Sequence, residues 1–166
     1  MKKIFLTGKI GVGKSTLLDR LVGTLSLSFG GFRVLPIIDE RQLKGFKIRD
    51  IETGEEESIA YFDEDFLIHP VVEGFENLGV KSLKNALESK DLVVMDELGF
   101  LESEAESFKR TVFEVLKSDR FVLGIIKAER NPFLDEVAKC VEIVEVTEKN
   151  RDNLSQELRR IFNGTL

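Results

Sequence analysis

The sequence has little of what builds disulfide-linked, metal-clustered or membrane-spanning proteins. Its 166 residues include one cysteine, Cys140, and one histidine, His69. A lone cysteine cannot pair within the chain, which excludes a disulfide scaffold and favours a reducing compartment, so we predict a cytoplasmic location. A single histidine excludes a histidine-rich metal site. The apolar runs fall far short of the roughly 18 residues that a transmembrane helix needs.

The charge of the chain also limits its partners. Thirty acidic against 24 basic side chains leave a net charge of −6, which argues against general binding to a nucleic-acid backbone. The first residues are basic, as in a signal peptide, but the apolar run that follows stops at Gly8 without a cleavage-type sequence. We therefore expect no export signal, no membrane contact, no nucleic-acid partner and a monomeric protein.

The chain alternates between short apolar runs and amphipathic stretches, as layered α/β domains do. No linker or internal repeat divides it, so residues 1–166 are expected to form a single domain. Strands are expected at Lys3–Thr7, Phe32–Ile38, Leu92–Met95, Phe121–Ile126 and Val141–Val146. A Thr53–Gly54 turn between two apolar stretches predicts a β-hairpin inserted at about residues 44–62. The predicted fold is a three-layer α/β sandwich with a mostly parallel sheet of about five strands and helices on both faces.

Apolar residues at helical spacing predict the helices between these strands. The first helix begins at Lys14 and is expected to stop at Gly30–Gly31. Another follows Ser103–Glu106, which has the spacing of a capping box. Asn150 is expected to cap the last helix. Residues 63–75 are expected to be a loop.

The segment from Gly8 to Thr16 carries the most specific motif in the chain. It reads G-K-I-G-V-G-K-S-T and matches G-x-x-x-x-G-K-[ST] in full. It follows an apolar strand and opens an amphipathic helix. There, glycines let backbone N–H groups curl around a phosphate, and the helix N-terminus adds the positive end of its dipole. A nucleoside triphosphate is the expected ligand.

Every residue of this loop is a candidate for contact with the phosphates, namely Gly8, Lys9, Ile10, Gly11, Val12, Gly13, Lys14, Ser15 and Thr16. Lys14 is expected to reach the β- and γ-phosphates, and the Ser15 hydroxyl to bind Mg²⁺. A dinucleotide-binding fingerprint is the rival interpretation, because Gly11 and Gly13 match its first half. Thr16 stands where its third glycine belongs, and Lys14 and Ser15 would be unexplained.

A phosphate loop needs an acidic partner for Mg²⁺ at the end of a neighbouring strand. Asp96 and Glu97 directly follow the apolar run Leu92–Met95. We therefore expect Asp96 to hold Mg²⁺, directly or through water, and Glu97 to polarise the water that attacks the γ-phosphorus. The alternatives are a simple strand-ending residue for Asp96 and a supporting or solvated role for Glu97.

Two further groups of polar residues are candidates for nucleotide contact. Asn150 and Arg151 follow the last predicted strand, so at that edge of the sheet they can contact the base or ribose, although helix capping explains Asn150 without a ligand. One basic cluster lies on or beside the predicted hairpin: Arg41, Lys44, Lys47 and Arg49. This cluster is either a solvated face or a positive lid over the phosphates.

Several segments match a known family along nearly the whole chain. They are the phosphate loop, the run D-E-L-G-F-L-E at Asp96–Glu102 with Phe108 downstream, Asn150–Leu154, and Gly45–Phe46 followed by Thr53–Glu55. Together they resemble the THEP1-type, or cancer-related, P-loop nucleoside-triphosphatase family. The phosphate loop alone is common to many families, but the run at Asp96–Glu102 is considerably more specific.

This resemblance implies a RecA-type or kinase-like domain that slowly hydrolyses several nucleoside triphosphates, with Mg²⁺, to diphosphate and phosphate. ATP and GTP are both expected substrates, because no Asn-Lys-x-Asp type guanine-reading segment is present. The chain departs from the family pattern at Lys9–Ile10 and near Glu40–Arg41, where an expected threonine is missing. The alternatives are a kinase that passes the γ-phosphoryl group to a nucleotide or small metabolite, and a nucleotide-dependent switch.

Overall fold

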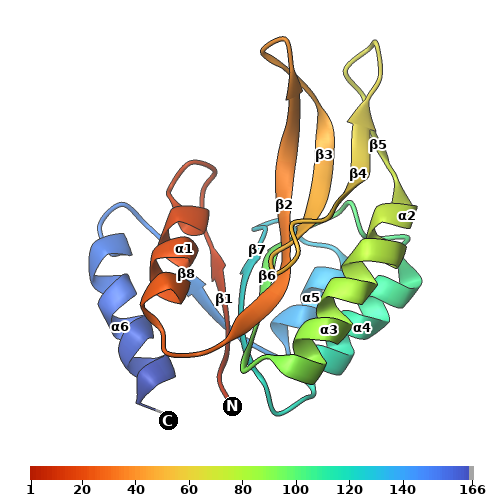
Figure 1. The fold of residues 1–166 in the computed structure, drawn as a ribbon. Helices are drawn as coiled ribbons and strands as arrows, with labels where there is room; N and C mark the ends of the chain where they lie inside the picture. Colours follow the sequence, from red (N-terminus) through yellow and green to blue (C-terminus); the bar gives the residue numbers. More distant parts are fainter. Residues whose placement is uncertain (165–166) are drawn as a thin grey trace.

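The strands of the protein form one eight-stranded sheet in a computed structural model, which describes residues 1–164 (Figure 1). They are β1 Lys3–Thr7, β2 Phe29–Asp39, β3 Gln42–Asp50, β4 Glu56–Phe62, β5 Ile68–Pro70, β6 Leu92–Leu98, β7 Phe121–Ile126 and β8 Glu142–Glu145. Their order is β5-β4-β3-β2-β6-β7-β1-β8. Neighbouring strands in the series β2-β6-β7-β1-β8 pair in parallel. Neighbouring strands in the series β5-β4-β3-β2 pair antiparallel. The α/β class is confirmed, but about five strands is an underestimate, because an antiparallel extension joins the parallel core.

Helices cover both faces of this sheet (Figure 1). They are α1 Lys14–Thr24, α2 Val72–Gly74, α3 Val80–Ser89, α4 Glu106–Leu116, α5 Pro132–Ala138 and α6 Arg151–Asn163, with a π-helical turn η1, Phe75–Gly79, between α2 and α3. Helices α1 and α6 share one face, and α3, α4 and α5 share the other. Among residues 1–164, no helix combines the length and apolar character that crossing a membrane requires.

The central strand β6 shows why both faces must be covered. Leu92 and Val94 belong to the core beneath α1 and α6, whereas Val93 and Met95 belong to the core beneath α3 and α4. All four side chains are fully buried. A continuous apolar run is what a parallel strand between two helical layers requires.

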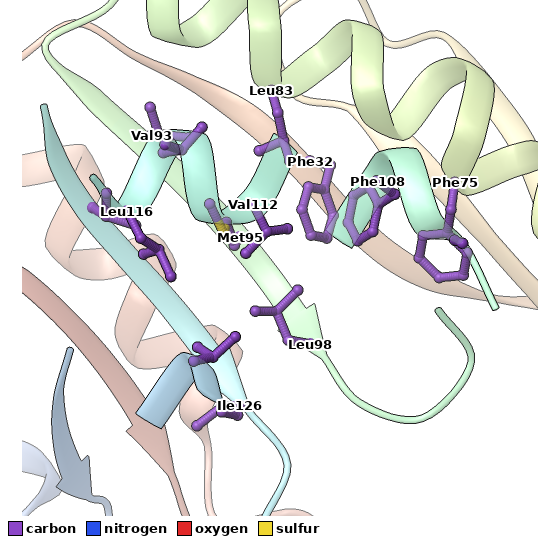
Figure 2. Close-up of a cluster of buried hydrophobic side chains, with 14 of the residues drawn as sticks. Phe32, Phe75, Leu83, Val93, Met95, Leu98, Phe108, Val112, Leu116 and Ile126 are labelled. Atoms are coloured by element: carbon purple, nitrogen blue, oxygen red, sulfur yellow. The ribbon is translucent and has the colours of Figure 1, made fainter. Parts of the chain in front are cut away.

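A row of phenylalanine rings joins the sheet to α4 (Figure 2). Phe108 of α4 lies between Phe32 of β2 and Phe75 of η1, at ring-centroid distances of 5.4 and 5.0 Å. Rings at such distances add attraction to their buried area. Packing of Phe108 therefore fixes α4, and with it the far end of the loop that leaves β6.

Strands β2 to β5 form an antiparallel arm, residues 34–70, that projects beyond the carboxyl ends of the parallel strands (Figure 1). The predicted hairpin is confirmed as β3 and β4, paired antiparallel around residues 51–55. The prediction of a loop at residues 63–75 is wrong, because this stretch contains β5, α2 and the first residue of η1.

Side-chain contacts at the outer turn explain why β5 forms. The Asp63 Oδ1 atom accepts hydrogen bonds from the backbone N–H groups of Asp65 and Leu67, which reverses the chain. His69 then stacks on Tyr61 of the neighbouring strand, with ring centroids 5.0 Å apart. A strand of this length has too few residues for its alternation to be recognised in the sequence.

Gly30 and Gly31 lie within β2 and do not end the first helix, which stops at Thr24. Gly31 has φ +124°, and a Cβ atom there would lie 2.0 Å from the Val94 carbonyl oxygen. Glycine at position 31 therefore serves the close approach of β2 to β6.

The predicted capping box at Ser103–Glu106 is also wrong. Helix α4 begins after Ala105, and the Ser103 hydroxyl donates to the Phe100 carbonyl oxygen in the preceding loop. The cap comes instead from Glu76 of η1, whose carboxylate accepts the backbone N–H of Ser107 at 3.0 Å. A side chain distant in sequence satisfies the helix end, so no local pattern could identify it.

We expect Glu76→Ala to lower the free energy of unfolding by about 1 kcal/mol, the usual cost of a lost helix cap. Ser103→Ala is the matched comparison and should cost less, because its hydroxyl serves only the exposed loop. Urea unfolding of both variants measures the difference. A larger loss for Ser103→Ala than for Glu76→Ala would contradict this account of the cap.

Candidate functional site

The phosphate-loop motif forms the connection between β1 and α1. Gly8, Gly11 and Gly13 have φ angles of +145°, +82° and +99°. At Gly8 a Cβ atom would lie 2.6 Å from the carbonyl oxygen of Val146, so a side chain there has no room. The glycines therefore allow a curled loop that side chains would prevent.

Lys14 closes this loop on itself. Its Nζ atom donates hydrogen bonds to the carbonyl oxygens of Gly8 at 2.7 Å and Lys9 at 3.0 Å. The ammonium group thus lies at the loop, within reach of any anion bound there. The loop borders a depression of about 280 Å³, which is lined by Ile10, Gly11, Gly13, Lys14, Ser15, Thr16 and Glu97.

The structure brings Asp96 to Ser15, as the motifs predict. Asp96 lies near the end of β6 and is 4% exposed, and its Oδ1 atom accepts a hydrogen bond from the Ser15 hydroxyl at 3.4 Å. Burial raises the pKa of Asp96 to about 6, opposed by the positive charge of Arg33. Two hard oxygen donors therefore meet beside the phosphate loop.

This pair of oxygens fits Mg²⁺. The ion takes oxygen ligands and is usually held by one or two carboxylates together with waters and substrate phosphates. Among residues 1–164, no group of three or more His, Cys, Asp or Glu side chains could hold a metal ion. Ser15 and Asp96 are thus two oxygen ligands of the kind that Mg²⁺ takes, and waters and substrate phosphates are the usual remaining ones.

Arg33 also belongs to the candidate site, although no sequence motif indicated it. It lies opposite Asp96 in the β2–β6 register, and its Nε atom is 3.5 Å from Asp96 Oδ2. Its guanidinium group also pairs with Asp19 of α1. The one available signal was a charged residue inside the apolar run 32–38. Arg33 therefore connects β2, β6 and α1 at the proposed metal position.

Glu97 reaches the same depression from β6 and has its own cation. Its side chain is 30% exposed, and its Oε1 atom lies 3.7 Å from Lys127 Nζ. Lys127 follows β7, and its ammonium group lies 5.2 Å from the centre of the Phe100 ring. Glu97 therefore borders the phosphate loop with its carboxylate paired to Lys127, a partner that no sequence pattern indicated.

Asn150 and Arg151 contact different partners. Asn150 Oδ1 accepts the backbone N–H of Thr147 at 2.7 Å, and Nδ2 donates to the Glu145 carbonyl oxygen at 2.8 Å. The expected cap is thus wrong, because this side chain holds the turn before α6 and receives no helical N–H. Arg151 Nη1 donates to the Val12 carbonyl oxygen at 3.3 Å, which brings Arg151 to the phosphate loop.

Three of the four residues in the basic cluster of the arm have local partners. Lys47 and Arg49 both pair with Glu56 of β4, at 3.1 and 2.6 Å. Lys44 donates to the side chain of Gln42. These contacts favour the solvated-face interpretation over a lid on the phosphates.

The curled loop, the Ser15–Asp96 pair and the parallel sheet are the features of a P-loop NTPase. A family profile described as NTPase matches residues 3–159. The nucleoside-triphosphatase THEP1 of Thermotoga petrophila is 34% identical over 163 residues, covering 94% of this chain and 90% of that protein. The THEP1 of Methanocaldococcus jannaschii is 34% identical over 170 residues, covering 98% of each. The chain therefore belongs to this family of NTPases, which confirms the resemblance drawn from its motifs.

Solved structures agree with this assignment. The crystal structure of THEP1 from the hyperthermophile Aquifex aeolicus has a TM-score of 0.81 and 25% identity, covering 96% of this chain and 98% of that chain. The solution structure of a human cancer-related nucleoside triphosphatase has a TM-score of 0.80 at 22% identity over the full length of both chains. The second likeness concerns the fold alone.

Glu102 is a buried acid beside the site and offers a test through pH. It is 2% exposed, and its Oε1 atom accepts the Gly99 N–H at 2.6 Å. Burial raises the pKa of Glu102 from 4.5 to about 7. At pH values between 4.5 and about 7, the Glu102 carboxyl group keeps its proton in the folded protein but has lost it in the unfolded chain. The contribution of Glu102 to stability is therefore full below about pH 4.5 and is lost as pH rises to 7.

We expect Glu102→Gln to gain stability relative to the unmodified protein, by about 1–3 kcal/mol, when the pH is raised from 5 to 8. Glutamine keeps the acceptor for Gly99 and cannot ionise, and any constant cost of its amide cancels between the two pH values. Urea unfolding at both pH values measures the change, with Glu104→Gln, at an exposed position, as the control. Parallel pH profiles of the unmodified and Glu102→Gln proteins would contradict the assignment.

Proposed function

We propose that this chain hydrolyses nucleoside triphosphates to nucleoside diphosphate and phosphate, with Mg²⁺ and with little preference among bases. One observation carries the proposal: Glu97 borders the same depression as the phosphate loop. A carboxylate next to the bound γ-phosphate is placed to accept a proton from an attacking water. Membership of the NTPase family supports the same reaction.

The loop would bind the phosphates through its backbone N–H groups and the N-terminus of α1. Lys14, which now donates to carbonyl oxygens of the loop, would turn to the β- and γ-phosphate oxygens. Ser15 and Asp96 would hold Mg²⁺. When bound, the ion would offset negative charge on the phosphates.

Glu97 would orient the attacking water and take its proton. Lys127 would hold the Glu97 carboxylate in position. Arg33 would keep the Asp96 carboxylate ionised and directed toward Ser15. The chain thus supplies phosphate binding, metal binding and proton transfer from neighbouring elements.

The nucleoside would lie beside Arg151. A depression of about 390 Å³ borders the phosphate loop on that side, and its lining includes Arg20, Arg151 and Asp152. A guanidinium plane stacks on any base and does not distinguish one from another. Asn150 would act on the nucleoside only indirectly, by shaping the turn that places Arg151.

Further expectations concern the protein as a whole. We infer a monomer in the cytoplasm with no nucleic-acid or membrane partner, and one domain over residues 1–166 with the hairpin as an insertion. The net charge of −6 and the lone cysteine support these inferences. Size-exclusion chromatography tests the oligomeric state.

Glu97→Gln should lower turnover by about 10² to 10⁴, because the amide keeps the shape but cannot accept the proton. Binding of the triphosphate should persist, since the phosphate loop is unchanged. Phosphate release and equilibrium binding with ATP and Mg²⁺ measure the two effects, and Glu104→Gln, at an exposed position of the loop between β6 and α4, is the control. Normal turnover in Glu97→Gln would refute the assigned base, and tight binding without turnover in the unmodified protein would indicate a switch.

ATP and GTP should be hydrolysed with kcat/KM values of the same order. Arg151→Ala should raise KM for both by a similar factor, because it removes a contact made to either nucleoside. Arg159→Ala, at an exposed position of α6, is the matched control and should change neither. A preference above roughly a hundredfold, about 2.7 kcal/mol, would require a dedicated base pocket and contradict this view.

A further inference from the structure

A second cavity also borders Glu97, between the arm and the loop that follows β6. Its volume is about 40 Å³. Its apolar walls include Val34, Phe46 and Ile68 of the arm, Phe75 of η1, and Phe100 and Leu101 of the loop. A cavity of this volume exceeds the roughly 10–15 Å³ that one water needs. It therefore has room for water or for a molecule of a few heavy atoms, and none for a nucleotide.

Glu97 is common to this cavity and to the phosphate depression. It lines both, and its carboxylate lies 3.7 Å from Lys127, which also lines the cavity. A molecule in the cavity would thus lie beside the group that we propose as the base, and the same residue borders the phosphate depression. A nucleophile that this base activates must be within hydrogen-bond reach of it.

The walls of the cavity select the chemistry of its occupant. Glu97 and the buried Glu102 place two carboxyl groups at its lining against the one ammonium group of Lys127, which disfavours an anionic occupant such as a sugar phosphate. Apart from Gly99, the other lining residues are aliphatic or aromatic, and contact with them favours a short hydrocarbon over water. The matching occupant is a small neutral molecule with one hydroxyl group and a short apolar tail.

We propose that this cavity is a nucleophile subsite and that the enzyme transfers the γ-phosphoryl group to small primary alcohols as well as to water. The inference rests on the proposed hydrolysis. The alcohol oxygen forms a bond to the γ-phosphorus while the bond from phosphorus to the β–γ bridging oxygen breaks. The hydroxyl proton passes to the Glu97 carboxylate and then to solvent. The products are an alkyl phosphate and the nucleoside diphosphate.

The test incubates the full chain with ATP, Mg²⁺ and methanol, ethanol, 1-propanol or 1-butanol, and measures alkyl phosphate and inorganic phosphate by ³¹P NMR. We expect alkyl phosphate with the shorter alcohols. The ratio of alkyl phosphate to inorganic phosphate should fall about tenfold at the first alcohol that is too long for the cavity. A change of about tenfold is a usual discrimination for one methylene group. Alkyl phosphate should be absent when the protein is omitted.

Two variants of Ile68 show whether the alcohol enters through the cavity. Ile68→Ala enlarges it and should move the fall to a longer alcohol, whereas Ile68→Phe fills it and should lower the ratio for every alcohol. Ile38→Ala, an exposed isoleucine of the same arm, should leave the ratios unchanged. Where Ile68→Phe fails to fold, as judged by thermal unfolding, Ile68→Ala decides the question.

The outcomes separate this inference from the proposed function. Phosphate release without alkyl phosphate for any alcohol would overturn the subsite and leave hydrolysis intact. Equal ratios in the unmodified protein and both folded Ile68 variants would also overturn it, because the alcohol would then attack from open solvent. Absence of both phosphate and alkyl phosphate would refute the proposed hydrolysis itself.

Discussion

The buried carboxylate of Asp96 is the constraint on which the rest of the site depends. A charge this far from water needs partners, and Asp96 has the Ser15 hydroxyl on one side and the Arg33 guanidinium on the other. These partners come from α1 and β2, so three elements must meet at the end of β6. The phosphate loop, which leads directly into α1, is thereby held against the strand end that carries both acids.

Strand β2 contributes both to the arm and to the candidate site. Phe32 and Arg33 are consecutive, so their side chains point to opposite faces of the sheet. Phe32 packs against Phe108 in the core, and Arg33 faces Asp96 and α1. Beyond this pair the same strand continues into the arm, where Val34 reaches the cavity beside Glu97. The packing that orders the core therefore also sets the distance between the arm and the proposed catalytic carboxylate.

The parts of the site that could be predicted from the sequence are those formed by residues consecutive in the chain. The phosphate loop and the strand before Asp96 are local patterns, and the fold places them together as parallel topology requires. Arg33 and Lys127 escaped detection, because each becomes significant only through a partner distant in sequence. The prediction of the α4 cap was wrong for the same reason, because Glu76 lies 31 residues before the N–H group that it binds. Local propensity predicts elements well, whereas the contacts that end and orient them are tertiary.

A chain with net charge −6 that binds a polyanion must do so through local charge. At physiological salt the screening length is about 8 Å, so acids on distant surfaces have little effect at the phosphate loop. Asp96 and Glu97 are different, because they border the loop itself and would repel a triphosphate directly. Each has a cation of its own, Arg33 at 3.5 Å and Lys127 at 3.7 Å. These two pairings would allow the carboxylates that we propose for metal binding and proton transfer to lie beside bound phosphates without repelling them.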